Sequence, residues 1–181
     1  MQRSFARNCL CVGLMTVAAL SSSAQEVPAA RQDDVSSVDA IITVSYAALS
    51  HSPGRPADLQ RFQSLFRPGA QLINLNGLGG KPAIKAGTIE QITQMLLSTQ
   101  HPERGHFEKE LARRTEQYGN VAHVWSTYQS RDAEDGHSTQ VRGINSISLV
   151  NDGQRWWIVS AQWMNETKAR PIPQQYLKGK R

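Results

Sequence analysis

The chain has 181 residues, which is enough for one domain of ordinary size with a buried core. Hydrophobic residues make up 39% and charged residues 19%, and the chain holds 13 glycines and 8 prolines, a composition that excludes disordered, collagen-like and coiled-coil proteins. The formal net charge of +5 raises the question of nucleic-acid binding, and the answer depends on where the basic residues lie.

The first 24 residues have the pattern of a secretory signal peptide. Arg3 and Arg7 form a positive start, residues 9–20 are apolar and uncharged, and the small residues that follow favour cleavage after Ala24. The apolar run is too short to cross a bilayer core of about 30 Å as a permanent helix. We therefore expect an exported protein, periplasmic or secreted, without a transmembrane segment.

Both cysteines, Cys9 and Cys11, lie in this leader, so the mature chain is expected to contain no disulfide and no cysteine ligand. The basic residues form no face on the body, because five of them gather in residues 168–181, a tail without acids that we expect to be solvated. The body itself has slightly more acids than bases. Nucleic acid is therefore not an expected partner.

Helical periodicity begins after a linker at residues 25–32. Asp58 has the position of an N-cap, and Thr88 with Gln91 fits a capping box at the start of another helix. Apolar residues recur every three or four positions in each helical stretch. The predicted elements of this half are helices at 33–49 and 58–66, a brief strand at 72–75, and a helix that starts at 88.

After residue 102 the hydrophobic period changes from helical to alternating. Turn residues at 118–120 and 151–153, and a polar loop at 132–139, separate the alternating stretches. Helices followed by an antiparallel meander indicate an α+β domain over residues 33–167, in which three helices cover one face of a curved, mainly antiparallel sheet. The predicted strands span residues 105–117, 121–131, 141–150 and 155–165.

Four stretches stand out in this order of elements: FEKEL at 107–111, YGNVAHVWSTY at 118–128, residues 143–150, and NDGQRWWIV at 151–159. Together with the order itself, they resemble the nuclear transport factor 2-like superfamily, which includes the SnoaL-like proteins. The resemblance covers about residues 35–166, and it implies a cone with a central pocket between the concave sheet and the helices, and a homodimer through the other face of the sheet. It implies no particular chemistry, because one scaffold carries unrelated sites.

The last predicted strand is apolar on both of its alternating faces. In the dimer that the resemblance implies, Trp156 and Ile158 face the cone, whereas Trp157, Val159 and Trp163 face a partner. The alternative is a strand that is buried on both sides within one subunit.

Three residues are candidates for acid–base chemistry. His123 lies in the middle of a strand, where an imidazole serves either as a general base near neutral pH or as a hydrogen-bonded part of the fold. Glu108 and Glu110 lie two apart on a strand and therefore point to one side. Inside the cone they would supply an acid and a base, whereas outside it they would pair with arginines such as Arg113.

Further side chains are candidates for lining a pocket for a small apolar ligand, although aromatic residues at such places also form cores. These residues are Tyr46, Trp125, Tyr128, Asn145 and Gln162. His101, His106, Glu108 and His123 follow no metal-ligand spacing, so neither a metal nor a cofactor is expected. Residues 77–81 resemble a phosphate loop only in their glycines, since Pro82 stands where a hydroxyl is needed.

Three classes of function are consistent with the sequence, one leading class and two alternatives. The sequence favours an exported protein that binds a small ligand or acts as an accessory domain. The first alternative is an acid–base enzyme, such as an isomerase, dehydratase or cyclase, with His123 or Glu108 as the base. The second is a protein–protein interaction module. There is no nucleophile elbow to support acyl-enzyme chemistry.

Overall fold

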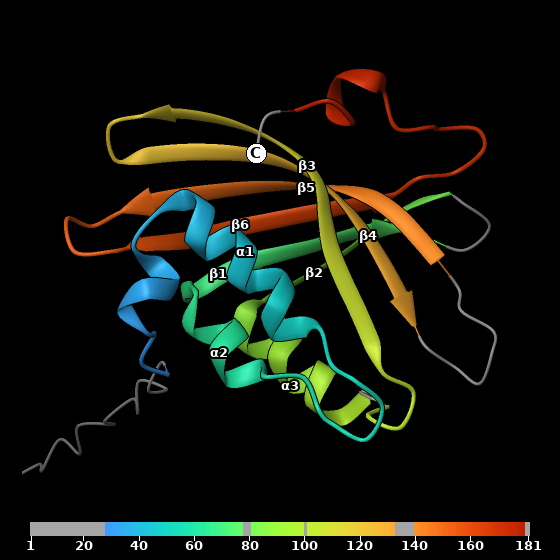
Figure 1. The fold of residues 1–181 in the computed structure, drawn as a ribbon, viewed down its shortest axis with the longest axis horizontal. Helices are drawn as coiled ribbons and strands as arrows, with labels where there is room; N and C mark the ends of the chain where they lie inside the picture. The colour runs from blue at the N-terminus through green and yellow to red at the C-terminus, as the bar shows by residue number, and fades with distance from the viewer. Residues whose placement is uncertain (1–27, 78–80, 100, 133–139, 180–181) are drawn as a thin grey trace, which may run out of the picture.

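The computed structural model describes residues 28–77, 81–99, 101–132 and 140–179. Three α-helices pack on one face of a curved sheet of six strands, so the predicted α+β class is confirmed (Figure 1). Within these residues no helix is both long and apolar enough to cross a membrane. The predicted signal peptide, and residues 133–139 of the predicted polar loop, lie outside the described residues.

The helices begin where polar side chains cap their first amides. Helix α1 (Val38–Leu49) follows Ser37, whose hydroxyl accepts a hydrogen bond from the Ala40 amide at 3.0 Å. Helix α2 (Leu59–Ser64) is capped by Asp58, and α3 (Ile89–Thr99) starts with the predicted capping box of Thr88 and Gln91. The first predicted helix is divided in two, because a short 3₁₀ helix, η1 (Gln32–Val35), precedes the cap of α1.

The sheet has the strand order β2-β1-β6-β5-β4-β3. The four C-terminal strands form the predicted antiparallel meander, whereas β1 pairs parallel with β6 and makes the sheet mixed. The sequence prediction missed β2 and shortened β1, because β2 is a largely exposed edge strand without alternating hydrophobicity. The strands are β1 (Phe66–Asn76), β2 (Pro82–Thr88), β3 (His106–Tyr118), β4 (Val121–Asp132), β5 (Gln140–Asn151) and β6 (Trp156–Asn165).

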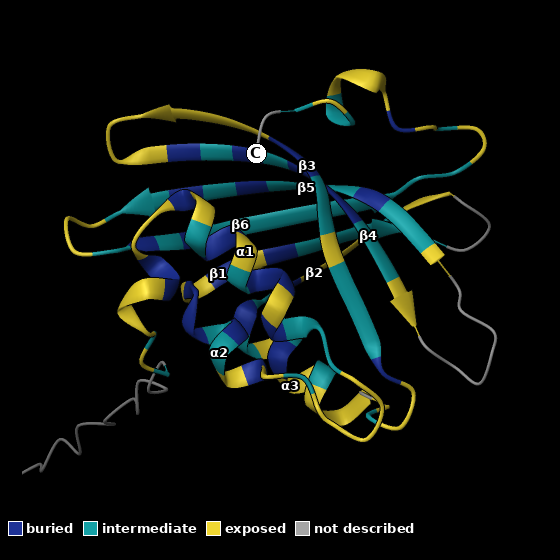
Figure 2. Ribbon diagram, viewed as in Figure 1, coloured by how far each residue is buried: buried dark blue, intermediate teal, exposed yellow. Residues whose placement is uncertain are grey.

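The core lies between the helices and the sheet. Dark blue, buried segments of α1 and of the central strands face one another in Figure 2. Burial of these side chains supplies the main favourable term in folding, about 1.5–3 kcal/mol for each large aliphatic residue. The aliphatic side chains that are almost wholly inaccessible are Val35, Ile41, Ile42, Leu65, Ile89, Val124, Leu149 and Ile158.

A β-bulge in β6 reverses the expected orientation of the second half of this strand. Ile158 and Ser160 pair with successive residues of β5, which leaves Val159 without a partner. Trp163 therefore lies on the helix-facing side and packs against the core. The prediction that Trp163 faces a partner subunit is wrong for this reason, whereas Trp156 faces the core as predicted.

The C-terminal segment lies against the outer face of the sheet, opposite the helices. The Thr127 hydroxyl donates a hydrogen bond to the backbone carbonyl of Tyr176 at 2.6 Å, and the Tyr176 ring lies 5.6 Å from the ring of Trp125. Ile172 is buried, and the 3₁₀ helix η3 (Gln174–Tyr176) follows it. The described part of the predicted solvated tail is therefore docked on the protein.

Truncation after Thr167 tests this docking. Loss of the segment uncovers Thr127 and removes the burial of Ile172, so we expect the free energy of unfolding to fall by about 2 kcal/mol. Urea denaturation of the mature protein measures the change, and truncation after Gly179 is the matched control that keeps every contact described above. Equal midpoints for the two truncated proteins would contradict a docked segment.

Candidate functional site

The polar side chains of β3 that face the helices are brought together by a second bulge. Glu110 pairs with Tyr128 of β4, and Arg113 pairs with Ser126, so Leu111 is one residue too many on β3. Residues three apart on a regular strand point to opposite faces. The bulge therefore turns Arg113 to the same side as Glu110.

Glu110 and Arg113 form a buried, bidentate ion pair. Arg113 Nε donates to Glu110 Oε1 at 2.9 Å, and Nη2 donates to Oε2 at 2.7 Å. The two side chains are 12% and 4% exposed, and Arg113 also donates to Asp39 at the start of α1. The predicted arginine partner of Glu110 is thus present, but on the same strand instead of across the sheet.

A chain of hydroxyl groups continues from this pair into the interior. Ser126 Oγ donates to Glu110 Oε1 at 2.5 Å, which uses its single proton. Tyr46 must then donate to Ser126, at 2.7 Å, and it accepts a hydrogen bond from Asn145 Nδ2 at 2.9 Å. Burial raises the pKa of Tyr46, and the hydrogen bonds to Ser126 and Asn145 only partly oppose this, so its hydroxyl stays protonated.

His106 forms a second charged cluster at the start of β3. Its Nε2 lies 3.2 Å from Glu108 Oε1, and its Nδ1 lies 2.5 Å from Asp132 Oδ1. The hydrogen bond with Glu108 raises the pKa of His106 to about 9, with help from Asp132 and against the effect of burial. The imidazole is therefore cationic at neutral pH, and it donates a hydrogen bond to one carboxylate oxygen of Glu108.

Tyr128 connects the interior to the far end of the sheet. Its hydroxyl donates to Asn165 Oδ1 at 2.5 Å, and burial raises its pKa. The ring reaches Asn165 by lying across Gly143, where an added Cβ would come within 2.5 Å of the Tyr128 oxygen. Asn76 of β1 donates to the same Oδ1 at 3.3 Å and accepts a hydrogen bond from the Asn165 backbone amide at 2.7 Å.

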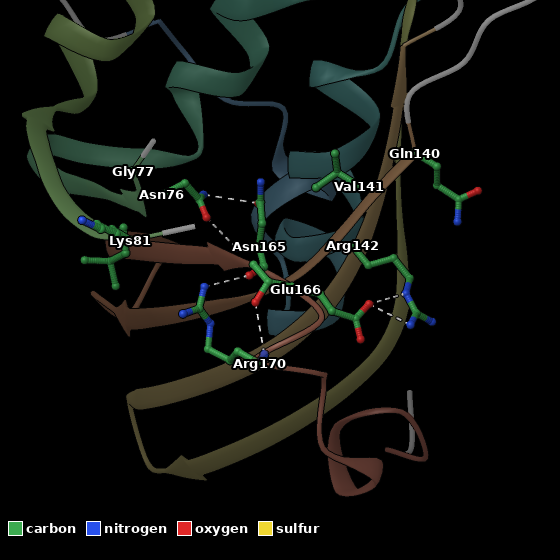
Figure 3. Close-up of a pocket in the computed structure, with 11 residues that line it drawn as sticks. Asn76, Gly77, Lys81, Gln140, Val141, Arg142, Asn165, Glu166 and Arg170 are labelled. Atoms are coloured by element: carbon green, nitrogen blue, oxygen red, sulfur yellow. Dashed lines mark hydrogen bonds and ion pairs between the residues drawn. The ribbon is translucent and has the colours of Figure 1, made fainter. Parts of the chain in front are cut away.

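A cavity of about 400 Å³ opens at this end, where β1, β5 and β6 meet the start of β2 (Figure 3). Arg142 and Glu166 in its wall are ion-paired at 2.7 Å, and Arg170 Nη2 donates to the backbone carbonyl of Asn165 at 3.3 Å. The amide, guanidinium and ammonium groups of the lining can donate hydrogen bonds to a ligand and balance a negative charge on it. Its polar and charged members are Asn76, Lys81, Gln140, Arg142, Asn165, Glu166, Thr167 and Arg170.

The structure brings five of the sequence-predicted site residues to the helix-facing side and leaves three on the outer face. Tyr46, Glu108, Glu110, Tyr128 and Asn145 lie together on the inside, as the hydrogen bonds and strand register show. His123, Trp125 and Gln162 lie on the other face.

His123 therefore does not enter the cone as a base. Its Nε2 is hydrogen-bonded to Ser146 Oγ at 3.0 Å, its ring lies 5.0 Å from the ring of Trp125, and Ser146 in turn pairs with Gln162. Alternation grouped His123 and Trp125 correctly on one face, but that face is the outer one. His123 faces outward because Ala122 and Val124 form the apolar side of β4, and the helices cover that side.

Sequence analysis did not single out Ser126, Asn165 or the charged lining of the cavity. Ser126 was accessible to prediction, since it alternates with Tyr128 and shares its face. Asn165 and Lys81 were not, because their proximity depends on the parallel pairing of β1 with β6 and on the undetected strand β2. Within the described residues no group of three or more His, Cys, Asp or Glu side chains could hold a metal ion.

No protein-family model and no curated protein matches this sequence. Solved structures do match. The beta subunit of a provisionally assigned aromatic-ring-hydroxylating dioxygenase from Novosphingobium aromaticivorans has a TM-score of 0.59 at 13% identity, over 78% of this chain and 98% of its own.

Two further structures share the fold. A nuclear transport factor 2-like superfamily protein from Salmonella enterica serovar Typhimurium has a TM-score of 0.52 at 20% identity, over 74% of this chain and 94% of its own. A provisionally assigned scytalone dehydratase from Novosphingobium aromaticivorans has a TM-score of 0.54 at 10% identity, over 72% of this chain and 82% of its own. These similarities show the fold alone, which agrees with the predicted resemblance.

Replacing Arg113 by alanine tests the buried ion pair. The change leaves Glu110 buried without its cation, so we expect the free energy of unfolding to fall by about 3–5 kcal/mol. Arg114→Ala is the matched control, because Arg114 is half-exposed on the same strand and its ion pair among the described residues is with exposed Glu116. Equal denaturation midpoints for the two variants would show that the pair does not support the fold.

Proposed function

Given a chain with the nuclear transport factor 2-like fold, we propose that it is an exported protein that binds a small ligand at the open end of its sheet. The observation that carries the proposal is the cavity around Asn165, whose volume of about 400 Å³ suits a small molecule. Export rests on the leader pattern of residues 1–24.

The hydrogen bonds of the interior support a site at this end instead of at the centre of the cone. Tyr46 donates its hydroxyl proton to Ser126, Ser126 donates its own to Glu110, and Glu110 is held by Arg113. A ligand at the centre would have to displace these bonds and leave a buried charge without its partner. None of these four side chains lines the cavity at the sheet end.

The acid–base alternative has one observation in its favour. Glu108 lies beside cationic His106 on the helix-facing side, where its charge also raises the pKa of Tyr128. One protein of the same fold is provisionally assigned as a scytalone dehydratase. Against it, Glu110 is committed to Arg113, so the predicted pair of carboxylates does not supply a free acid and a free base.

The homodimer implied by the resemblance stays a prediction. The docked C-terminal segment already contacts Trp125 and Thr127 on the outer face of the sheet. A dimer through this face would therefore use the part of the sheet beyond these two residues.

Native mass spectrometry of protein recovered from the exported fraction of its host tests the proposal. We expect a mature chain that starts at Gln25 and carries a small-molecule adduct. Val141→Trp should lose the adduct, because the indole fills the cavity, whereas Val150→Trp on the same strand, away from the cavity, should keep it. An adduct retained by Val141→Trp would contradict the site, and a chain that keeps residues 1–24 would contradict export.

A further inference from the structure

The side-chain amide of Asn165 is held in one orientation. Its Oδ1 accepts hydrogen bonds from the Tyr128 hydroxyl at 2.5 Å and from Asn76 Nδ2 at 3.3 Å. Two donors at one atom identify that atom as the oxygen, so the other atom is the NH₂ group. That group donates to no described residue, although Asn165 lines the cavity.

This orientation depends on residues behind the cavity wall. Tyr128 is almost fully buried, and it reaches Asn165 only because Gly143 has no side chain. A donor that is fixed before a ligand arrives loses little conformational entropy on binding. Tyr128 and Gly143 are thus positioning residues for the Asn165 amide.

The charges around this amide are unequal. Glu166 is the single acid among the described lining residues, and it is already paired with Arg142 at 2.7 Å. Arg170 and Lys81 form no ion pair with a described carboxylate, and Arg170 Nη2 lies 3.3 Å from the Asn165 carbonyl oxygen. An excess of positive charge therefore lines the same cavity as Asn165, whose NH₂ group has no described partner.

We propose that the ligand of this cavity carries an oxyanion, a carboxylate or a phosphate, which accepts hydrogen bonds from Asn165 Nδ2 and the Arg170 guanidinium near the charge of Lys81. This inference rests on the proposed function, because it names the chemical class of the ligand for the same cavity. Planar guanidinium groups favour such anions through paired hydrogen bonds.

The test uses three probes on the mature chain: hexanoate, hexanol and inorganic phosphate. Titrations are followed by nuclear magnetic resonance, through the side-chain amide signals of Asn165 in ¹⁵N-labelled protein. We expect hexanoate or phosphate to shift these signals and to bind at least about tenfold more tightly than hexanol. The tighter of the two anions then identifies the head group as a carboxylate or a phosphate.

Two variants make the test specific. Asn165→Asp keeps the oxygen that Tyr128 and Asn76 contact, but it replaces the NH₂ donor by a second, negatively charged oxygen, so anion binding should be lost. Because this variant has no side-chain amide at position 165, its titrations, and those of the wild-type protein beside it, are followed through the backbone amide signals of the lining residues Val141 and Thr167. Arg170→Gln should weaken anion binding about tenfold. Its matched control is Arg67→Gln, since Arg67 is exposed on β1 and does not line the cavity.

The outcomes separate the two claims. If neither hexanoate nor phosphate binds more tightly than hexanol, or if Asn165→Asp binds the anion at the wild-type level, the anion inference is overturned while the cavity remains a ligand site. If none of the three probes shifts the Asn165 signals, and no adduct accompanies the exported protein, the proposed function fails as well.

Discussion

The buried ion pair between Glu110 and Arg113 is the constraint on which the interior of this protein depends. Removing a guanidinium from water costs several kcal/mol unless a carboxylate and further hydrogen bonds replace the lost hydration. Here the bulge at Leu111 brings the two side chains to one face, and Asp39 joins the pair to the start of α1. The orientations of Ser126, Tyr46 and Asn145 then follow, because each hydroxyl has one proton to donate. One irregular residue in β3 thus determines the hydrogen bonding of two strands and a helix.

This arrangement separates the scaffold from the site. The centre of the cone, where the fold predicts a pocket, is occupied by side chains that hydrogen-bond to one another. A separate hydrogen bond lies toward the end of the sheet, where Tyr128, the next helix-facing residue after Ser126 on β4, crosses Gly143 to fix the Asn165 amide in the cavity wall. The interior network and the Tyr128–Asn165 hydrogen bond are therefore carried by neighbouring helix-facing residues of β4. On this account the buried polar residues support ligand binding without touching the ligand.

The sequence was informative where structure depends on neighbouring residues. The caps at Asp58 and Thr88, the four C-terminal strands and the α+β class were predicted correctly, because caps and alternation are local signals. Alternation also grouped Glu108 with Glu110. It could not tell which face of β4 the helices cover, so it left open whether His123 is a base in the cone or a hydrogen-bonded part of the fold, and the structure has the second. The bulges at Leu111 and Val159 and the parallel pairing of β1 with β6 depend on long-range contacts, and the cavity depends on them in turn.

The most direct measurement is a crystal structure of the protein purified from its natural host under conditions that retain a bound ligand. The account predicts ligand density in the cavity at the sheet end, in contact with Asn165 and Arg170, and unchanged hydrogen bonds from Tyr46 through Ser126 to Glu110. Density at the centre of the cone, with Tyr46 displaced and the ligand against Glu108, would contradict it. That result would favour acid–base chemistry in the cone, and it would mean that the cavity at the sheet end is not the ligand site.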